Sequence, residues 1–190
     1  MSSTTKNISK GAKVTDAKNG QGAPSPVLSR EESIAKLGHM IKGIRIAMFT
    51  TIDKDGKMTS RPMATQAQDF DGSLWFFTKL DSGKVKCIEH NHHVNVAYSD
   101  ASTSKFVSVA GLARRVDDLA KKKELWNPML KAWFPDGFED PEVALICVDV
   151  DSAELWDSPG RLVNLVGMAA AIATGKQFKG IGDNEKIELH

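Results

Sequence analysis

Three side chains that can bind a phosphate group lie within seven residues of the chain. Thr78 and Ser82 carry hydroxyl groups, and Lys84 carries a mobile positive charge. The Asp81-Ser82-Gly83 segment predicts a helix N-terminus, where free backbone N–H groups and the helix dipole favour an anion. The stretch therefore predicts a site for a phosphate monoester. The alternative is that Ser82 only caps a helix and Lys84 is only a solvated charge, since such sequences are common.

A second stretch, Ser60-Arg61-Pro62-Met63, adds a residue that suits the same ligand. The guanidinium group of Arg61 is planar, always charged and well matched to a phosphate. Pro62 falls inside a predicted strand, although proline cannot donate a hydrogen bond to a sheet. We therefore expect this strand at a sheet edge or a bulge, with backbone groups free for a ligand.

Two other groupings suggest metal binding less strongly. His90, His92 and His93 are close in sequence, but two of them would lie on opposite faces of a strand, and a histidine at a helix C-terminus is favoured by the helix dipole without a metal. The acidic turns at 53–56 and 69–72 are typical of strand boundaries, where Asp before Gly supplies side-chain caps and positive φ. We expect no metal ion, and the sequence identifies no catalytic residue.

The composition limits the class of protein. The chain has 190 residues, of which 41% are hydrophobic and 26% charged, with a formal net charge of +1, so we expect one domain and no nucleic-acid partner. No run approaches 18 apolar residues and no signal peptide is evident, which predicts a cytoplasmic protein without a membrane contact. Cys87 and Cys147 lie among apolar residues, which favours buried thiols over a disulfide or a catalytic nucleophile.

The N-terminal half of the chain contains clear boundaries. Residues 1–27 are polar and lack apolar periodicity, which predicts a disordered tail. Ser29 and Glu32 have capping-box spacing, which predicts a helix over 30–42. Acidic turns separate the next three strands, so we expect an antiparallel meander. The expected strands are 46–52, 57–66 and 73–78, followed by a helix at 83–90 and a strand at 94–98.

The C-terminal half is expected to complete a barrel. A strand over 105–116 contains Gly111, which indicates a bulge or a close backbone approach. Asp117-Asp118 caps a helix that Pro128 should kink, with Leu119 and Lys122 on its apolar face. The remaining predicted elements are a strand at 143–150, a segment at 153–156 that pairs with it, a helix at 159–175 whose small residues suit contact with another subunit, and a polar tail at 176–190.

About six strands without β-α-β alternation predict a mainly β domain with peripheral helices over residues 28–158. An antiparallel barrel fits this pattern better than a Rossmann sheet. Neither Gly-x-Gly-x-x-Gly nor a P-loop occurs, so a dinucleotide or nucleoside triphosphate has no dedicated cradle.

Together, the segments at 60–63, 75–78 and 82–84 resemble the pyridoxamine 5′-phosphate oxidase-like family of FMN-binding split barrels, and within it the general stress protein 26 branch. In that branch Ser-Arg-Pro-Met, Trp-Phe-Phe-Thr and Ser-x-Lys together hold FMN. The resemblance runs from Ile34 to Trp156 and implies a six-stranded antiparallel split β-barrel and a homodimer with FMN at its interface. It implies ten cofactor-binding residues: Ser60, Arg61, Pro62, Met63, Phe77, Thr78, Ser82, Lys84, Trp133 and Trp156.

The resemblance also assigns roles within that set. Arg61, Ser82 and Lys84 would hold the phosphate, and backbone around Met63 and Phe77 to Thr78 would face the ring. The family draws aromatic contacts from the partner chain, for which the candidates are Trp133, Phe134 and Trp156. Indole stacks well on a planar ring, although an aromatic on an apolar helix face is more often part of the core.

Two departures argue against vitamin B6 oxidation. True pyridoxamine phosphate oxidases continue from a Trp to Arg-Leu-His-Asp-Arg, whereas here Arg161-Leu162 is followed by Val163-Asn164-Leu165. Gln66 also stands where those enzymes have a lysine. The loss of these charged groups should weaken binding of a doubly charged substrate.

We therefore expect a flavoprotein, either an FMN-dependent oxidoreductase that uses NAD(P)H or another donor, or a non-catalytic stress protein that sequesters flavin. Residual pyridoxamine phosphate oxidation and a haem-binding barrel are further alternatives. The sequence does not name a substrate.

Overall fold

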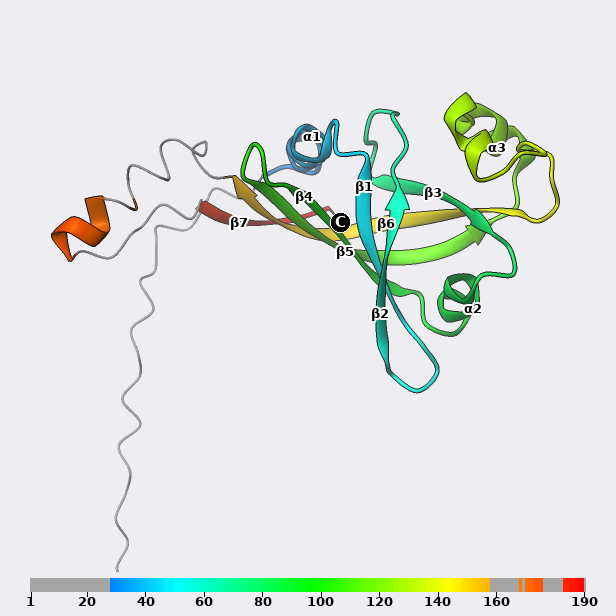
Figure 1. Cartoon of the computed structure of the whole chain (residues 1–190), viewed down its shortest axis with the longest axis horizontal. Helices are drawn as coiled ribbons and strands as arrows, with labels where there is room; N and C mark the ends of the chain where they lie inside the picture. Colours follow the sequence, from blue (N-terminus) through cyan, green and yellow to red (C-terminus); the bar gives the residue numbers. More distant parts are fainter. Residues whose placement is uncertain (1–27, 158–167, 169, 176–182, 190) are drawn as a thin grey trace, which may run out of the picture.

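One antiparallel sheet carries most of the chain in the computed structural model, which describes residues 28–157, 168, 170–175 and 183–189. Helices pack around this sheet (Figure 1). The strands are β1 (Ile46–Ile52), β2 (Met58–Ala64), β3 (Ser73–Lys79), β4 (His93–Asp100), β5 (Lys105–Val116), β6 (Val143–Asp157) and β7 (Asp183–Glu188). The helices are α1 (Arg30–Ile41), α2 (Gly83–His90), α3 (Leu119–Leu125) and the 3-10 helix η1 (Pro128–Ala132).

The sheet curls into a barrel that is split between β2 and β3. The strand order is β2-β1-β4-β5-β6-β3, with β7 also paired to β6, so β2 and β3 are both edge strands. The expected mainly β split barrel is confirmed, and β2, which contains Pro62, lies at an edge as predicted. The sheet is not closed, because β2 and β3 form no ladder with each other.

The predicted three-strand meander is wrong at its last step. β3 pairs with β6, placing Phe76 opposite Ile146, and forms no ladder with β2. A tight turn would have kept β3 beside β2, but residues 65–72 form a longer connection that lets β3 leave. Beside β6, two apolar runs lie in register, with Leu74 opposite Val148 and Phe76 opposite Ile146, and all four side chains are buried in the main core.

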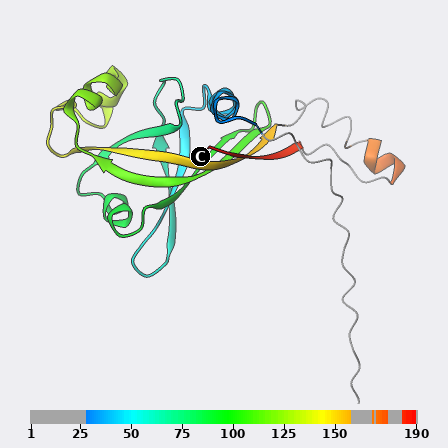
Figure 2. The same ribbon diagram turned by 180° about the vertical axis from the view of Figure 1, so that it is seen from behind.

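The long strand pair β5 and β6 contains the predicted irregularity at Gly111. The register shifts between Ala110 and Gly111, and a Cβ atom on Gly111 would lie 2.4 Å from the Asp149 carbonyl oxygen. The prediction that 153–156 folds back on 143–150 is wrong, because these residues are one strand, β6, and both halves pair with β5. The bulge lets β6 bend without a break in the strand. Figure 2 shows β6 running from the α3 end of the molecule to β7.

The end of the chain corrects the expected polar tail. Residues 183–188 form β7, which pairs with the last part of β6. Ile187 and Leu189 are buried in the main core, and Arg30 Nε donates a 3.0 Å hydrogen bond to the Leu189 carbonyl oxygen. Residues 168 and 170–174 are helical, in agreement with part of the helix predicted over 159–175. The predicted tail at 1–27 and the rest of that helix lie outside the described residues.

Two apolar cores hold the elements in place. The main core fills the barrel, to which α1 contributes Leu37 and Met40 and α2 contributes Ile88. The second core lies outside the barrel, where α3 and η1 cover Phe77 and Leu145.

The helix predicted after Asp117-Asp118 is two pieces rather than one kinked helix. α3 ends at Leu125, and η1 begins with Pro128. Leu119 is 54% exposed, against prediction, whereas Lys122 is buried as expected of that face. No helix in the described ranges is both long enough and apolar enough to cross a bilayer.

Candidate phosphate-binding site

A pocket of about 500 Å³ lies at the split between β2 and β3, and we call it the β2–β3 pocket. Its walls come from β2, the end of β3, the start of α2 and the end of η1. The edge position of β2 and β3 creates this pocket, because neither strand has a neighbour on that side. Seven of the ten predicted cofactor residues line it: Pro62, Met63, Phe77, Thr78, Ser82, Lys84 and Trp133.

The two predicted hydroxyl groups and the predicted lysine contact one another. Lys84 Nζ donates a 2.7 Å hydrogen bond to Thr78 Oγ1, and Thr78 Oγ1 lies 3.3 Å from Ser82 Oγ. Ser82 is the N-cap residue of α2, but its side chain makes no capping hydrogen bond. The backbone N–H groups of the first turn of α2 therefore donate no hydrogen bond to the Ser82 side chain, and they can donate to an anion instead.

Arg61 brings a second positive charge to this cluster. Its Nη1 donates a 2.9 Å hydrogen bond to Oγ1 of Thr51, a residue with no exposed surface. Burial lowers the pKa of Lys84, the nearby charge of Arg61 lowers it further, and Asp81 opposes the shift. Neither cation forms an ion pair with a carboxylate within the described part of the chain. The site is thus electropositive and supplied with hydrogen-bond donors.

Three predicted site residues do not line the pocket. Arg61 approaches it only through its charge on Lys84. Ser60 points to the outside of β2, where its hydroxyl lies 2.6 Å from that of Thr50. Trp156 lies opposite Phe106, twelve residues along β6 from the residue that faces Thr78, a separation of about 40 Å along a strand.

The aromatic candidates therefore differ in position. Trp133, which is 58% exposed, and Phe134 both line the pocket of their own chain, although we expected them to act across an interface. Gln66 and Leu130 also line the pocket and were not predicted as site residues. Leu130 shares an apolar face with Trp133 in the sequence, which was the available signal. For Gln66 the sequence offers only its difference from the lysine of the oxidases.

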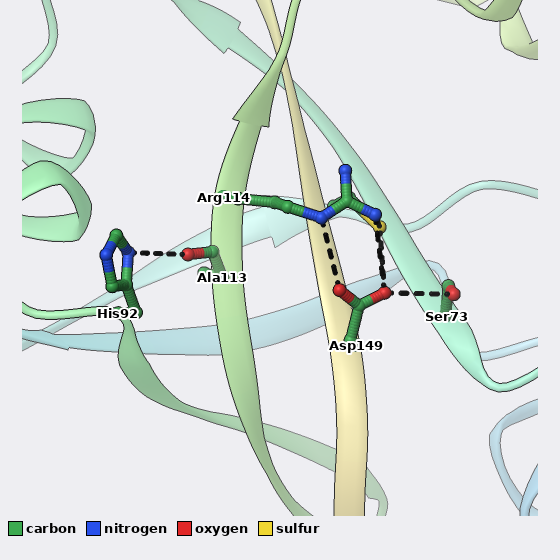
Figure 3. Close-up of polar contacts among 6 residues, drawn as sticks. Ser73, His92, Ala113, Arg114 and Asp149 are labelled. Atoms are coloured by element: carbon green, nitrogen blue, oxygen red, sulfur yellow. Dashed lines mark hydrogen bonds and ion pairs between the residues drawn. The ribbon is translucent and has the colours of Figure 1, made fainter.

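Other reactive side chains lie away from this pocket. Cys147 has no exposed surface, and burial, reinforced by the charge of Asp149, raises its thiol pKa to about 11. Figure 3 shows the guanidinium group of Arg114 against Asp149, with Nε 3.1 Å from the carboxylate and the Ser73 hydroxyl beyond it. His92 Nδ1 lies 3.3 Å from the Ala113 carbonyl oxygen. Because its pKa is raised, the Cys147 thiol is rarely ionised at neutral pH and is a poor nucleophile.

Comparison with known proteins gives a consistent result. The profile of the family described as "Pyridoxamine 5′-phosphate oxidase like" matches residues 32–179. Protein bli-3 from Neurospora crassa is 33% identical over 157 residues, which cover 77% of this chain and 75% of that protein.

Two solved structures extend the comparison. The general stress FMN/FAD binding protein from Xanthomonas citri is 32% identical with a TM-score of 0.57, over 67% of this chain and 89% of that one. A candidate general stress protein 26 from Jannaschia sp. CCS1 has a TM-score of 0.66 at 22% identity, over 84% of this chain and 99% of that one. At the lower identity, the likeness concerns the fold alone.

Proposed function

Because the chain belongs to the pyridoxamine 5′-phosphate oxidase-like family, we propose that its β2–β3 pocket binds a flavin nucleotide, namely FMN. The observation that carries this proposal is the convergence of Lys84, Thr78 and Ser82 at the start of α2, with Arg61 beside them. A phosphate monoester carries close to two negative charges at neutral pH, and two positive charges are available here, Lys84 on the lining and Arg61 near Lys84. The Xanthomonas citri protein, 32% identical, is described as an FMN/FAD binding protein, which supports the same ligand class.

The rest of the pocket suits a planar ring. Met63 and Phe77 are buried beside it, and Trp133 presents an exposed indole at its rim. Flavin rings are planar and amphipathic, and they pack favourably on aromatic and apolar side chains. These residues therefore favour an orientation in which a bound flavin places its phosphate at the α2 end of the pocket and its ring toward Trp133.

The proposed activity is that of an FMN-dependent oxidoreductase that takes electrons from NAD(P)H or another donor. Bound FMN would supply the hydride or electron transfer, and this chain would position the ring and neutralise the phosphate. The two free thiols, Cys87 and Cys147, fit the reducing cytoplasm that we propose as its location. Sequestration of flavin without turnover is the competing function.

We further propose that the protein is a homodimer that forms through the outer face of the barrel. Ile46 is 51% exposed, Met48 43% and Phe106 42%, and all three lie on this face. Met48 lies opposite Ala97 on β4, and Ala97 lies opposite Ser108 on β5, two residues from Phe106, so Met48 and Phe106 share that face. Their partners Pro62 and Trp156 lie on it too. An exposed apolar face of this kind is typical of an interaction site.

The same face explains how Trp156 could belong to a site that it does not reach in its own chain. Ile46 and Pro62 line the β2–β3 pocket as well as the outer face, so the pocket opens at the edge of that face. A second copy packed there would approach the pocket with its own β5 and β6 residues. Trp156 and Ser60 are candidates for that contact.

The test of the proposed function is flavin binding by the purified full-length protein. FMN, FAD and riboflavin are titrated into flavin-free protein while flavin fluorescence is recorded. We expect FMN to bind most tightly of the three. Arg61→Ala and Lys84→Ala should each weaken FMN binding by about 1.5–3 kcal/mol, or roughly 10- to 150-fold in the dissociation constant, because each removes a charged donor. Riboflavin has no phosphate, so its affinity should barely change.

Lys86→Ala is the matched control, because Lys86 is exposed on the same helix and does not line the pocket. Unchanged FMN affinity in both Arg61→Ala and Lys84→Ala would remove the site assignment. Steady-state oxidation of NADH or NADPH by the FMN-loaded protein then separates an oxidoreductase from a protein that only stores flavin.

A further inference from the structure

A second cavity of about 600 Å³ lies between α1, the 65–72 connection and the first half of β3, and we call it the α1 pocket. It borders the β2–β3 pocket at Gln66, which lines both. Its volume falls in the range of small-molecule sites. The function proposed above does not use it.

Tyr98 provides a polar group in this cavity. It lies on β4 with its side chain in the barrel core, is 3% exposed and lines the α1 pocket. Its hydroxyl group makes no hydrogen bond with any residue that the structure describes, and it is not fully buried: among the described residues, the one fully buried side-chain polar atom without a partner is Trp75 Nε1, also on this lining. Burial of the side chain raises the pKa of the Tyr98 phenol, so it stays neutral and able to donate. The Tyr98 hydroxyl is therefore free to donate a hydrogen bond to an acceptor in the cavity.

The inner wall of the cavity is apolar. Ile34 and Leu74 line it from α1 and β3, and Phe70 and Phe76 add two aromatic rings. Such a wall favours an aromatic or other flat apolar group.

The rim of the cavity is positively charged. Arg45 is exposed there and forms no ion pair with a described residue. Lys42 lies 3.8 Å from Asp69, but their side chains are 78% and 99% exposed, so this ion pair is weak. Among the described residues, Asp69 is the one carboxylate against Lys42 and Arg45 on the lining. An anionic group at the rim would meet a net positive charge.

We propose that the α1 pocket binds a small aromatic carboxylate, with its ring on the apolar wall, an acceptor at Tyr98 and its carboxylate at Arg45. This site is separate from the flavin site and does not depend on flavin binding. Because Gln66 borders both pockets, a ligand here would lie next to the flavin pocket.

The proposal is tested with 2-naphthoate and its neutral analogue 2-naphthamide, titrated into the full-length flavin-free protein by calorimetry. We expect 2-naphthoate to bind at least fivefold more tightly than 2-naphthamide. Arg45→Ala should weaken the binding of 2-naphthoate about 5- to 10-fold and leave the affinity for 2-naphthamide unchanged. Tyr98→Phe removes only the hydroxyl group and should weaken a ligand that accepts its hydrogen bond about fivefold.

Two further variants keep the outcome decisive if Tyr98→Phe impairs folding. Ala35 is an exposed residue of α1 on the lining, so Ala35→Trp should obstruct the cavity and abolish binding without a change in the core. Lys86→Ala, which removes a distant charge, should have no effect. Equal affinity of the two probes, absence of binding at 1 mM, or binding that Lys84→Ala abolishes and Arg45→Ala does not would each overturn the proposal.

Discussion

The ammonium group of Lys84 donates a hydrogen bond of 2.7 Å to Oγ1 of Thr78, so the start of α2 is tied to the end of β3. This contact excludes the interpretation of Lys84 as a freely solvated charge. It also places the ammonium group close to Arg61, since the charge of Arg61 lowers the pKa of Lys84. Two cations held together without an ion-paired carboxylate destabilise the unliganded site and prepare it for an anion.

The first prediction concerns the free energy of unfolding of Lys84→Gln without ligand. The pKa of Lys84 is lowered in the folded state, so the unfolded chain binds this proton more tightly and the charge opposes folding below that pKa. Lys84→Gln should therefore have an equal or higher Tm than the wild type at pH 7. The wild type should gain stability relative to the variant as pH rises from the lowered pKa toward 10.5.

The prediction is checked by measuring the Tm of the wild type and of Lys84→Gln between pH 7 and 10, with Lys86→Gln as a control at an exposed lysine of the same helix. A clear loss of stability in Lys84→Gln at pH 7 would show that its role is structural.

A second prediction concerns Thr51, which positions Arg61. Its hydroxyl is fully buried and accepts a 2.9 Å hydrogen bond from the guanidinium group. Thr51→Val keeps the shape but loses the acceptor, so we expect a loss of about 1–2 kcal/mol in unfolding free energy and several-fold weaker FMN binding. Thr50→Val on the same strand is the matched control, because the Thr50 hydroxyl contacts Ser60 at the surface. Its effect should stay within about 0.5 kcal/mol. Equal effects of the two variants would argue against positioning by Thr51.

Local sequence signals predicted the elements that form the site, but not their arrangement. Ser29 and Glu32 form the predicted capping box, and α2 has the predicted bounds at Gly83 and His90. Strand order depends on which distant strand offers the better apolar partner, so β3 beside β6 could not be read from the turn at 69–72. The approach of β2 and β3 across the open split depends on the path of the whole sheet, and this approach forms the β2–β3 pocket.

The chain end was missed for a related reason. β7 has few residues and a polar composition, and buried Ile187, with buried Leu189 directly after the strand, gives only one period of alternation. Such a short pattern indicates a strand only when a partner edge is known to be free. The second half of β6 supplies that edge.

The third prediction tests the close approach of β5 and β6. A Cβ atom on Gly111 would lie 2.4 Å from the Asp149 carbonyl oxygen and 3.0 Å from Val148 Cγ1. The backbone must move to admit it, so Gly111→Ala should cost about 2–3 kcal/mol, measured by urea denaturation. Gly83→Ala is the control, because a Cβ atom there meets nothing within 4 Å. A Gly111→Ala variant as stable as Gly83→Ala would contradict the bulge geometry.

The fourth prediction tests the outer face of the barrel as the dimer interface. Met48 lies at the centre of that face, between Pro62 of β2 and Ala97 of β4. Met48→Lys would bury an unpaired charge if a second copy packs there, so we expect the dimer to dissociate at micromolar concentration. Light scattering after size-exclusion chromatography measures the mass, and Met129→Lys, an equally drastic change of an exposed methionine on η1, should leave the mass unchanged.

If the pocket also takes Trp156 from the partner, the Met48→Lys monomer should bind FMN more weakly while its melting temperature without ligand changes little. A Met48→Lys protein that remains dimeric, or a wild type that is monomeric, would remove the interface and with it the reason to include Trp156 in the site.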